Sequence, residues 1–306
     1  MHTPITFIIF NRPDTTEQVF AEIAKAKPPK LFVVADGPRT DHPDDIERCA
    51  AARAIIERVD WECEVFKNYS EVNLGCGYRP ATGISWVFEH VEEAIILEDD
   101  CVPHPTFFRF CEELLEKYRD DGTVVQVSGF NPLYGSHKPE YSYFFYRIFA
   151  CWGWATWRRV WKFQDMKIKP WPELRDTSWL QETIGDFRGI EYFKKIFDNV
   201  YVNPANTDIW DHQFLFTCWV RNGLAICPGS NLVDNVGFRA DATHTKASQP
   251  VKHRVTGMNF PLRHPPKVVW DREADKLRVE QCIGQRTLPL YRRMRQKLSR
   301  IMESLL

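Results

Sequence analysis

The chain has 306 residues, of which 44% are hydrophobic and 26% charged, and its net charge is −1. Such a composition is typical of a soluble globular protein with one large domain or two ordinary ones. The nearly neutral balance excludes a protein that binds nucleic acid through bulk electrostatics. No apolar run reaches the roughly 20 residues of a membrane-spanning helix, and the N-terminus lacks a signal-peptide pattern. Nine cysteines without a Cys-x-x-Cys pair disfavour a zinc site, and we expect reduced thiols in the cytoplasm.

Strands and helices alternate through the first half of the chain. Apolar runs predict strands over 5–10, 31–35, 62–67, 93–98 and 124–127, and helical spacing predicts helices from about 15, over 44–59, over 79–91 and over 107–118. Repeated strand–helix units predict an α/β fold with a mostly parallel sheet flanked by helices. Ligands of such sheets bind beyond the carboxyl ends of the strands.

The most informative run is 93–100, where four apolar residues are followed directly by Glu98, Asp99 and Asp100. Mg²⁺ and Mn²⁺ prefer carboxylate oxygens, and sites that also serve phosphates use only one or two protein carboxylates. The run therefore predicts a metal–diphosphate site where a buried strand ends. The alternative is a solvated acidic loop.

The other strand ends add polar groups to the same edge: Asn11 and Arg12, then Asp36, then 128–131. The first strand is not followed by Gly-x-Gly-x-x-Gly, which disfavours a nicotinamide or flavin site, and the sequence has no P-loop motif. Phosphates bound here would be neutralised by metal rather than by a glycine-rich loop.

Two aromatic and acidic segments stand out in the second half. The run 151–161 contains four tryptophans, Trp152 and Trp154 among them, and indicates either a core element or a wall on which sugars stack. Further on, Asp208 is a candidate N-cap, Trp210 lies on the same helical face as Phe214, and Asp211 is either a capping carboxylate or a general base.

Two further features lie near the C-terminus. His244 stands in a polar, turn-like segment and is a candidate metal ligand or diphosphate contact, with a structural role as the alternative. The segment 286–306 predicts a basic amphipathic helix, which either docks on protein or lies on an anionic membrane surface.

Together these segments resemble GT-A-fold, metal-dependent nucleotide-sugar glycosyltransferases, in particular the branch of mannosyl-glycoprotein N-acetylglucosaminyltransferase I and its bacterial relatives. The resemblance runs from Ile5 to about His244. It is carried by Phe10-Asn11-Arg12, Val34-Ala35-Asp36, the acidic run as that family's form of the Asp-x-Asp signature, and Gly153-Trp154 with Trp210-Asp211.

The resemblance implies a Rossmann-like GT-A fold with a nucleotide-sugar-binding half (1–135), an aromatic acceptor half of the same domain (136–285) and the terminal helix (286–306). It implies inverting transfer of a hexosyl or N-acetylhexosaminyl group from a UDP-sugar, with Mn²⁺ or Mg²⁺ as cofactor. The acceptor would be a glycan, a lipid-linked glycan or a protein. The reaction would belong to the synthesis of bacterial surface polysaccharide. The enzyme would be cytoplasmic or peripheral at the inner face of the membrane.

The resemblance also implies residue roles. The nucleotide and donor would be bound by Asn11, Arg12, Asp36, Arg79, Glu98 and Asp99, with Asp36 on the uracil, Asp99 on the ribose and Glu98 near the sugar. The metal would be held by Asp100. From the residues themselves, His244 is a further candidate ligand, and Trp152, Trp154 and Trp210 are candidates for an acceptor wall. Asp211 would be the base, with Asp208 as the alternative because position 212 is His where the relatives carry a second Asp.

Two other classes of protein remain open. One is a non-catalytic sugar- or nucleotide-binding protein on the same fold, which would not need a base. The other is a sugar nucleotidyltransferase, which would carry a glycine-rich loop after its first strand. The presence of Glu98, Asp99, Asp100 and Asp211 together argues against a binding protein, and the run 10–14 contains no glycine, which argues against a nucleotidyltransferase. A transferase is therefore favoured.

Overall fold

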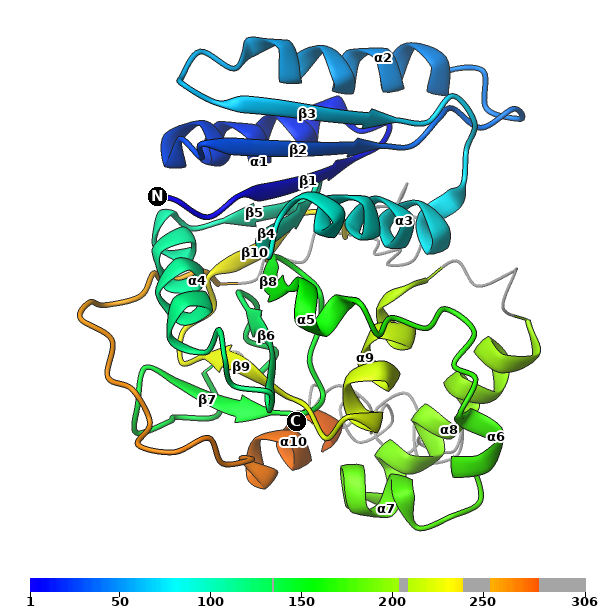
Figure 1. Ribbon diagram of the computed structural model, residues 1–306, viewed down its shortest axis with the longest axis vertical. Coiled ribbons are helices and arrows are strands. Elements are labelled where there is room, and N and C mark those ends of the chain that lie inside the picture. The colour runs from blue at the N-terminus through cyan, green and yellow to red at the C-terminus, as the bar shows by residue number, and fades with distance from the viewer. Residues whose placement is uncertain (134, 204–208, 239–253, 281–306) are drawn as a thin grey trace, which may run out of the picture.

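The computed structural model describes residues 1–133, 135–203, 209–238 and 254–280, and an eight-stranded sheet runs through it in the order β3-β2-β1-β4-β8-β6-β9-β7 (Figure 1). The strands of this sheet are β1 (Ile5–Ile9), β2 (Lys30–Ala35), β3 (Glu64–Tyr69), β4 (Glu93–Glu98), β6 (Val124–Ser128), β7 (Tyr143–Tyr146), β8 (Trp154–Trp157) and β9 (Leu224–Pro228). A separate antiparallel ribbon pairs β5 (Cys101–Pro103) with β10 (Val233–Asn235).

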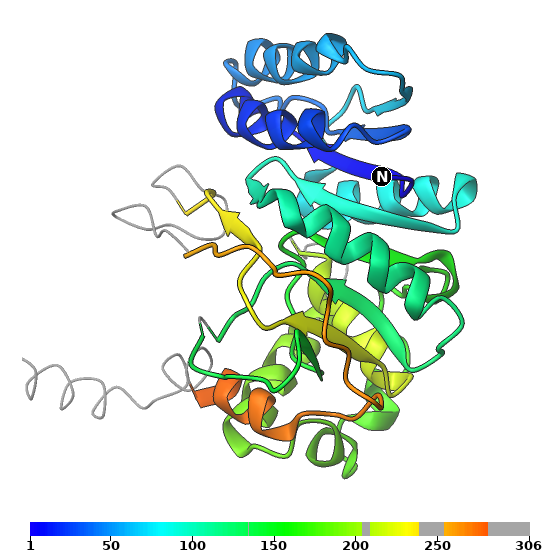
Figure 2. The same cartoon turned by 90° about the vertical axis from the view of Figure 1, so that its left-hand side faces the viewer.

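Helices cover both faces of the sheet. Helices α1 and α4 pack side by side on one face, and α3 and α5 pack side by side on the other (Figures 1 and 2). Figure 1 places α6, α7 and α8 together at one end of the second half, beside α9. The helices are α1 (Pro13–Ala26), α2 (Asp45–Ile55), the 3₁₀ turn η1 (Ile56–Arg58), α3 (Gly75–His90), α4 (Pro105–Lys117), α5 (Arg158–Trp161), α6 (Trp171–Leu174), α7 (Trp179–Ile184), α8 (Phe187–Val202), α9 (Asp211–Val220) and α10 (Arg272–Arg278).

The first four strands are parallel and follow the order 3-2-1-4, as in the first half of a Rossmann fold. Strand β8 then runs antiparallel between β4 and β6, and β9 continues parallel to β6. The two ends of the sheet are β3 and the antiparallel strand β7. The predicted fold class, a mostly parallel α/β sheet flanked by helices, is therefore confirmed, and both halves of the chain contribute strands to the same sheet.

Most of the predicted elements are present, and the differences have local causes. Helix α3 begins at Gly75, four residues before the predicted start, because the Asp36 carboxylate accepts hydrogen bonds from the amides of Leu74 and Gly75. Nothing near Gly75 in the sequence signals this long-range cap. Helix α9 begins at Asp211 with Trp210 at its N-cap, so the prediction of an N-cap at Asp208 is wrong.

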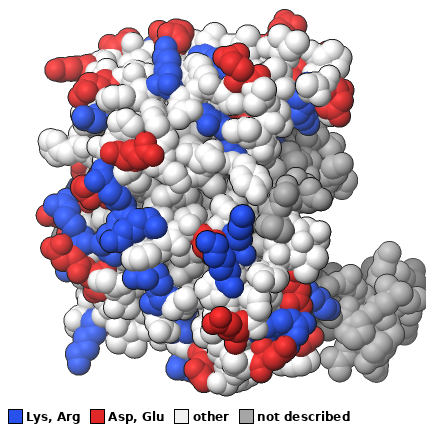
Figure 3. Space-filling view, turned by 45° about the vertical axis from the view of Figure 1, so that its right-hand side comes forward, with Lys and Arg blue, Asp and Glu red and all other residues white. Residues whose placement is uncertain are grey.

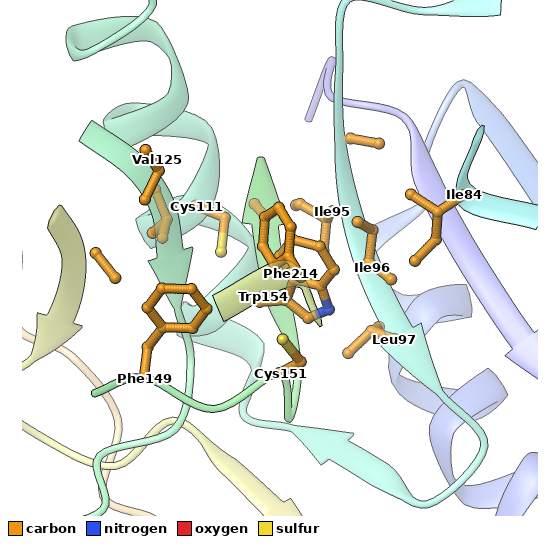
Figure 4. Close-up of a cluster of buried hydrophobic side chains, with 14 of the residues drawn as sticks. Ile84, Ile95, Ile96, Leu97, Cys111, Val125, Phe149, Cys151, Trp154 and Phe214 are labelled. Carbon is orange, nitrogen blue, oxygen red and sulfur yellow. The ribbon is translucent and has the colours of Figure 1, made fainter. Parts of the chain in front are cut away.

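The hydrophobic core continues across β4 and β8 into the second half. Figure 4 shows Trp154 between Ile95 and Ile96 of β4 and Phe214 of α9. Trp154 is fully buried, its ring centroid lies 5.1 Å from that of Phe214, and it stacks on Trp210 at 5.6 Å. This packing fixes the start of α9, and with it Asp211, against the central strands.

None of the helices in the described part of the chain combines the length and the apolar composition that crossing a bilayer requires. Acidic and basic side chains are interspersed over the face shown in Figure 3, in keeping with the nearly neutral net charge. The predicted terminal helix over 286–306 lies outside the described residues.

Candidate functional site

The carboxyl ends of β1 and β4 meet because these strands are parallel neighbours, with Ile8 opposite Glu98. Beyond this pair, Arg12 Nη1 lies 2.9 Å from Asp100 Oδ2 and 3.9 Å from Asp99 Oδ1. The backbone amide of Phe10 donates to Asp99 Oδ2 at 3.1 Å. The structure thus brings together the cation and the carboxylates that the sequence predicted to share one edge of the sheet.

The Asp100 turn is held from the other side by residues after β10. The amide of Val236 donates to the Asp100 carbonyl at 2.8 Å, and the amide of Gly237 donates to Asn235 Oδ1 at 2.9 Å. A Cβ on Gly237 would lie 2.1 Å from Asp100 Oδ2, far inside van der Waals contact. A side chain at this position would therefore displace the Asp100 carboxylate. The sequence analysis missed this role, although a glycine shortly after a short strand is a signal of close approach.

Two carboxylates of the acidic cluster, Glu98 and Asp99, have raised pKa values. Burial raises the pKa of Glu98 well above its usual value, and the charges of Asp100, Asp99 and Asp211 raise it further. Burial also raises the pKa of Asp99 to about 7, although the nearby Arg12 guanidinium opposes the shift. Clustered carboxylates in a poorly hydrated position favour a bound cation, since each charge makes the others harder to ionise.

Asp100 is the residue that would hold a divalent ion shared with a diphosphate. Among residues 1–133, 135–203, 209–238 and 254–280, no group of three His, Cys, Asp or Glu side chains is arranged to hold a metal by itself. Asp100 supplies one carboxylate, and the other positions of an Mg²⁺ or Mn²⁺ ion are commonly filled by water and substrate phosphates.

Asp211 reaches the same cluster from α9. Its charge raises the pKa of Glu98, and after burial it is the largest cause of the raised pKa of Cys151, ahead of Glu98. Asp211 Oδ1 accepts a hydrogen bond from the amide of His212 at 2.9 Å, and its side chain is 41% exposed. Asp211 is therefore a half-exposed first-turn carboxylate of α9, near enough to Glu98 for its charge to raise the pKa of Glu98.

Asp36 follows β2 and Arg79 belongs to α3, and both side chains make hydrogen bonds within the protein. Each Asp36 oxygen accepts two hydrogen bonds, from Gly37, Leu74, Asn73 and Gly75. Buried Arg79 donates to the Ala35 carbonyl at 3.0 Å and to Asn68 Oδ1 at 2.9 Å. A uracil contact by Asp36 would have to share an oxygen that already has two donors.

Asn11 belongs to a polar network that the sequence analysis did not predict. Its Nδ2 donates to Asp45 Oδ1 at 2.6 Å, and Arg39 Nε donates to Asp45 Oδ2 at 2.6 Å. Burial opposes ionisation of Asp45, but Arg39 and Asn11 outweigh it and lower the pKa to about 2. The Arg39 guanidinium also lies over the Phe10 ring, 5.5 Å from its centroid. No local motif connects these residues, because loops far apart in sequence bring them together.

The three tryptophans proposed as an acceptor wall lie in different surroundings. Trp154 and Trp210 are buried in the core, as the alternative interpretation expected. Trp152 is half-buried, and its ring contacts Phe130 at 4.5 Å and Phe238 at 5.4 Å. The left-handed backbone of Gly153 approaches Val233 of β10, where a Cβ would lie 2.7 Å from Cγ2. Asp208 and His244 lie outside the described residues.

No family model matches the sequence, and no curated protein matches it. Among solved structures, a UDP-glucose pyrophosphorylase in complex with UDP-glucose is similar to part of this chain. The two chains are 11% identical with a TM-score of 0.32, and the match covers 53% of this chain and 79% of the other. A similarity of this size carries no argument about activity or site residues.

Proposed function

We propose that this chain is a metal-dependent glycosyltransferase that moves a sugar from a UDP-sugar to an acceptor hydroxyl, with inversion at the anomeric carbon. The observation that carries the proposal is the stacking of Trp210 on Trp154, the partner of Ile96 in β4, which brings Asp211 at the start of α9 near the strand that ends in the 98–100 run. A metal-bound leaving group and a base are the two parts that such a transfer needs. A protein that only binds sugars does not need a base.

The donor would bind along the carboxyl ends of β1 and β4. Asp100 would hold Mn²⁺ or Mg²⁺, which when bound would offset the negative charge on the leaving diphosphate. Arg12, 2.9 Å from the same carboxylate, adds a fixed positive charge to this position. Asp99 is held in place by the Phe10 amide and would accept from the ribose. Asn11, Asp36 and Arg79 would shape the nucleotide end, and His244 would complete the metal shell.

Asp211 would take the proton from the acceptor hydroxyl. Its Oδ1 already accepts from the His212 amide, which leaves Oδ2 to receive the proton. The Asp211 carboxylate is half-exposed, whereas Glu98 is more buried and surrounded by anions, which raise the pKa of Glu98 and favour its neutral form. Asp208 is the alternative base, and half-buried Trp152 is a candidate acceptor contact.

The acceptor would be a glycan, a lipid-linked glycan or a protein. The enzyme would take part in the synthesis of a bacterial surface polysaccharide. On this proposal the enzyme works in the cytoplasm, with the segment 286–306 as its contact with the inner face of the membrane.

The test is release of UDP from a panel of UDP-sugars, with Mn²⁺ and after treatment with EDTA. Release from one UDP-sugar, only with metal, supports the proposal. The same protein is then offered UTP and sugar 1-phosphates. Release of pyrophosphate in that assay, without hydrolysis of any UDP-sugar, would identify a sugar nucleotidyltransferase instead.

A further inference from the structure

The Asp100 carboxylate is held at both of its oxygens by the protein itself. Arg12 Nη1 lies 2.9 Å from Oδ2, and the Cys101 thiol donates a hydrogen bond to Oδ1, with 3.5 Å between sulfur and oxygen. The Asp100 side chain is 15% exposed. The carboxylate therefore cannot turn without breaking one of these two contacts.

The thiol has a partner of its own on the paired strand. Asn235 of β10 lies directly opposite Cys101 of β5, and its Nδ2 lies 4.0 Å from the sulfur. Asn235 Oδ1 accepts a hydrogen bond from the amide of Gly237, so the NH₂ end of the Asn235 side chain is the end that faces the sulfur. The direction of these hydrogen bonds is therefore set, since Asn235 donates to the thiol and the thiol donates to Asp100.

A thiol suits this position because it is a weak donor. Cys101 is fully buried, and ionising a buried thiol beside a carboxylate is unfavourable, so the sulfur keeps its proton. The hydrogen bond of a thiol is weaker than that of a hydroxyl or a cationic group. The thiol can therefore orient the carboxylate and leave most of the negative charge on Oδ1 for a cation.

We propose that Cys101 is a positioning residue, whose thiol holds the Asp100 carboxylate in the orientation that receives the divalent ion. A residue that only filled the core at this position would need no donor. The role rests on the proposed function, because Asp100 is the residue placed on the metal. The hydrogen bond itself does not depend on that function and can be observed in the protein without metal or donor.

The first test is infrared spectroscopy of the full chain in the region of S–H stretching, with the Cys101 band isolated by subtracting the spectrum of Cys101→Ala. A hydrogen bond lowers the S–H frequency, so the band should move to higher frequency when Asp100→Ala removes the acceptor. The band of Cys111, isolated in the same way with Cys111→Ala, is the control and should not move, because this thiol lies beside Val125 in the core (Figure 4). A Cys101 band that Asp100→Ala leaves in place would overturn the proposal.

The second test is calorimetric titration of a UDP-sugar with Mn²⁺ into three variants. Cys101→Ala removes the donor and should weaken metal-dependent binding about fivefold, the loss expected for one modest hydrogen bond. Cys101→Ser restores a donor at the same position and should bind within about twofold of the unmodified protein. Cys111→Ala removes an equally buried thiol from the core and should leave binding unchanged.

The serine variant separates positioning from packing. If Cys101 only fills space, a buried hydroxyl should serve no better than alanine, so equal weakening in Cys101→Ala and Cys101→Ser would contradict the proposal. Unchanged binding in Cys101→Ala would contradict it as well. If the unmodified protein binds no UDP-sugar with Mn²⁺, the proposed function fails, and the infrared test still decides the hydrogen bond.

Discussion

Arg12 and Asp100 join the carboxyl ends of β1 and β4, with 2.9 Å between Nη1 and Oδ2. The two residues are 88 positions apart in sequence and meet because β1 and β4 are parallel neighbours. Arg12 is also the cation that opposes the raised pKa values of Glu98 and Asp99. One guanidinium thus balances a run of three carboxylates at the edge where we place the donor diphosphate.

Arg12→Ala should destabilise the protein, because it leaves these carboxylates facing one another without that charge. We expect the free energy of unfolding to fall by about 1–3 kcal/mol at pH 7, measured by urea denaturation. Arg58→Ala is the control, since Arg58 pairs with Glu17 on the exposed surface and should cost less than about 1 kcal/mol. An equal fall in the free energy of unfolding of the two variants would show that the Arg12–Asp100 pair stabilises the protein no more than an exposed ion pair does.

Gly237→Ala should disturb Asp100 directly. A Cβ at this position would lie 2.1 Å from Asp100 Oδ2, so the carboxylate must turn away. We expect metal-dependent donor binding to weaken by about tenfold or more, measured by calorimetry with Mn²⁺. Gly122→Ala is the matched control, because a Cβ there meets nothing within 4 Å and should leave binding unchanged. Normal donor affinity in Gly237→Ala would remove Asp100 from the metal site.

Asp211→Asn should separate binding from turnover. The variant keeps the size and the Oδ1 acceptor of the side chain but cannot take a proton, so we expect unchanged donor affinity and turnover lower by roughly 10²-fold or more. Asp208→Asn is the comparison. If Asp208→Asn causes the large loss and Asp211→Asn does not, the base lies three residues earlier in the sequence than we propose.

Asp275 predicts a pH dependence of stability that is independent of the site. Burial raises the pKa of Asp275 to about 6, despite hydrogen bonds from the amides of Ile148 and Arg147 and from the Trp270 indole. Because the folded pKa lies above the ordinary value of 3.8, the folded state binds the proton more tightly. This contribution to stability is therefore present below about pH 4 and is lost as the pH rises through 6.

Raising the pKa of Asp275 from 3.8 to about 6 corresponds to about 3 kcal/mol. Asp275→Asn cannot ionise, so its free energy of unfolding should lack this fall between pH 4 and 6, although its overall stability is lower because one acceptor oxygen is lost. Urea denaturation of both proteins across that range gives the difference. Identical pH profiles would show that the pKa of Asp275 is not raised in the folded protein.

Much of this architecture could be predicted from local sequence patterns, and the reasons differ by region. The strands β1, β2 and β4 are short apolar runs that end in polar residues, so both their positions and the gathering of Arg12 with Asp100 follow from hydrophobic periodicity and the parallel topology. The insertion of β8 between β4 and β6 could not be predicted, because antiparallel pairing of distant strands leaves no local signal.

The polar contacts between loops could not be predicted from the sequence either. The start of α3 depends on Asp36, which is 39 residues before Gly75, and the Asp45 network depends on Asn11, which is 34 residues before it. The tryptophan-rich run was ambiguous for a different reason. Density of aromatic residues indicates burial or stacking equally well, and only the packing shows that Trp154 is in the core while Trp152 is half-buried.

The most direct test of the central claim is calorimetric titration of a panel of UDP-sugars into the folded protein, with Mn²⁺ or with EDTA, repeated for Asp100→Ala. We predict that one UDP-sugar binds, that binding requires Mn²⁺, and that Asp100→Ala abolishes the metal-dependent part. If no UDP-sugar binds to folded, Mn²⁺-loaded protein, or if binding is the same with EDTA, a metal-dependent transferase is the wrong account of this chain.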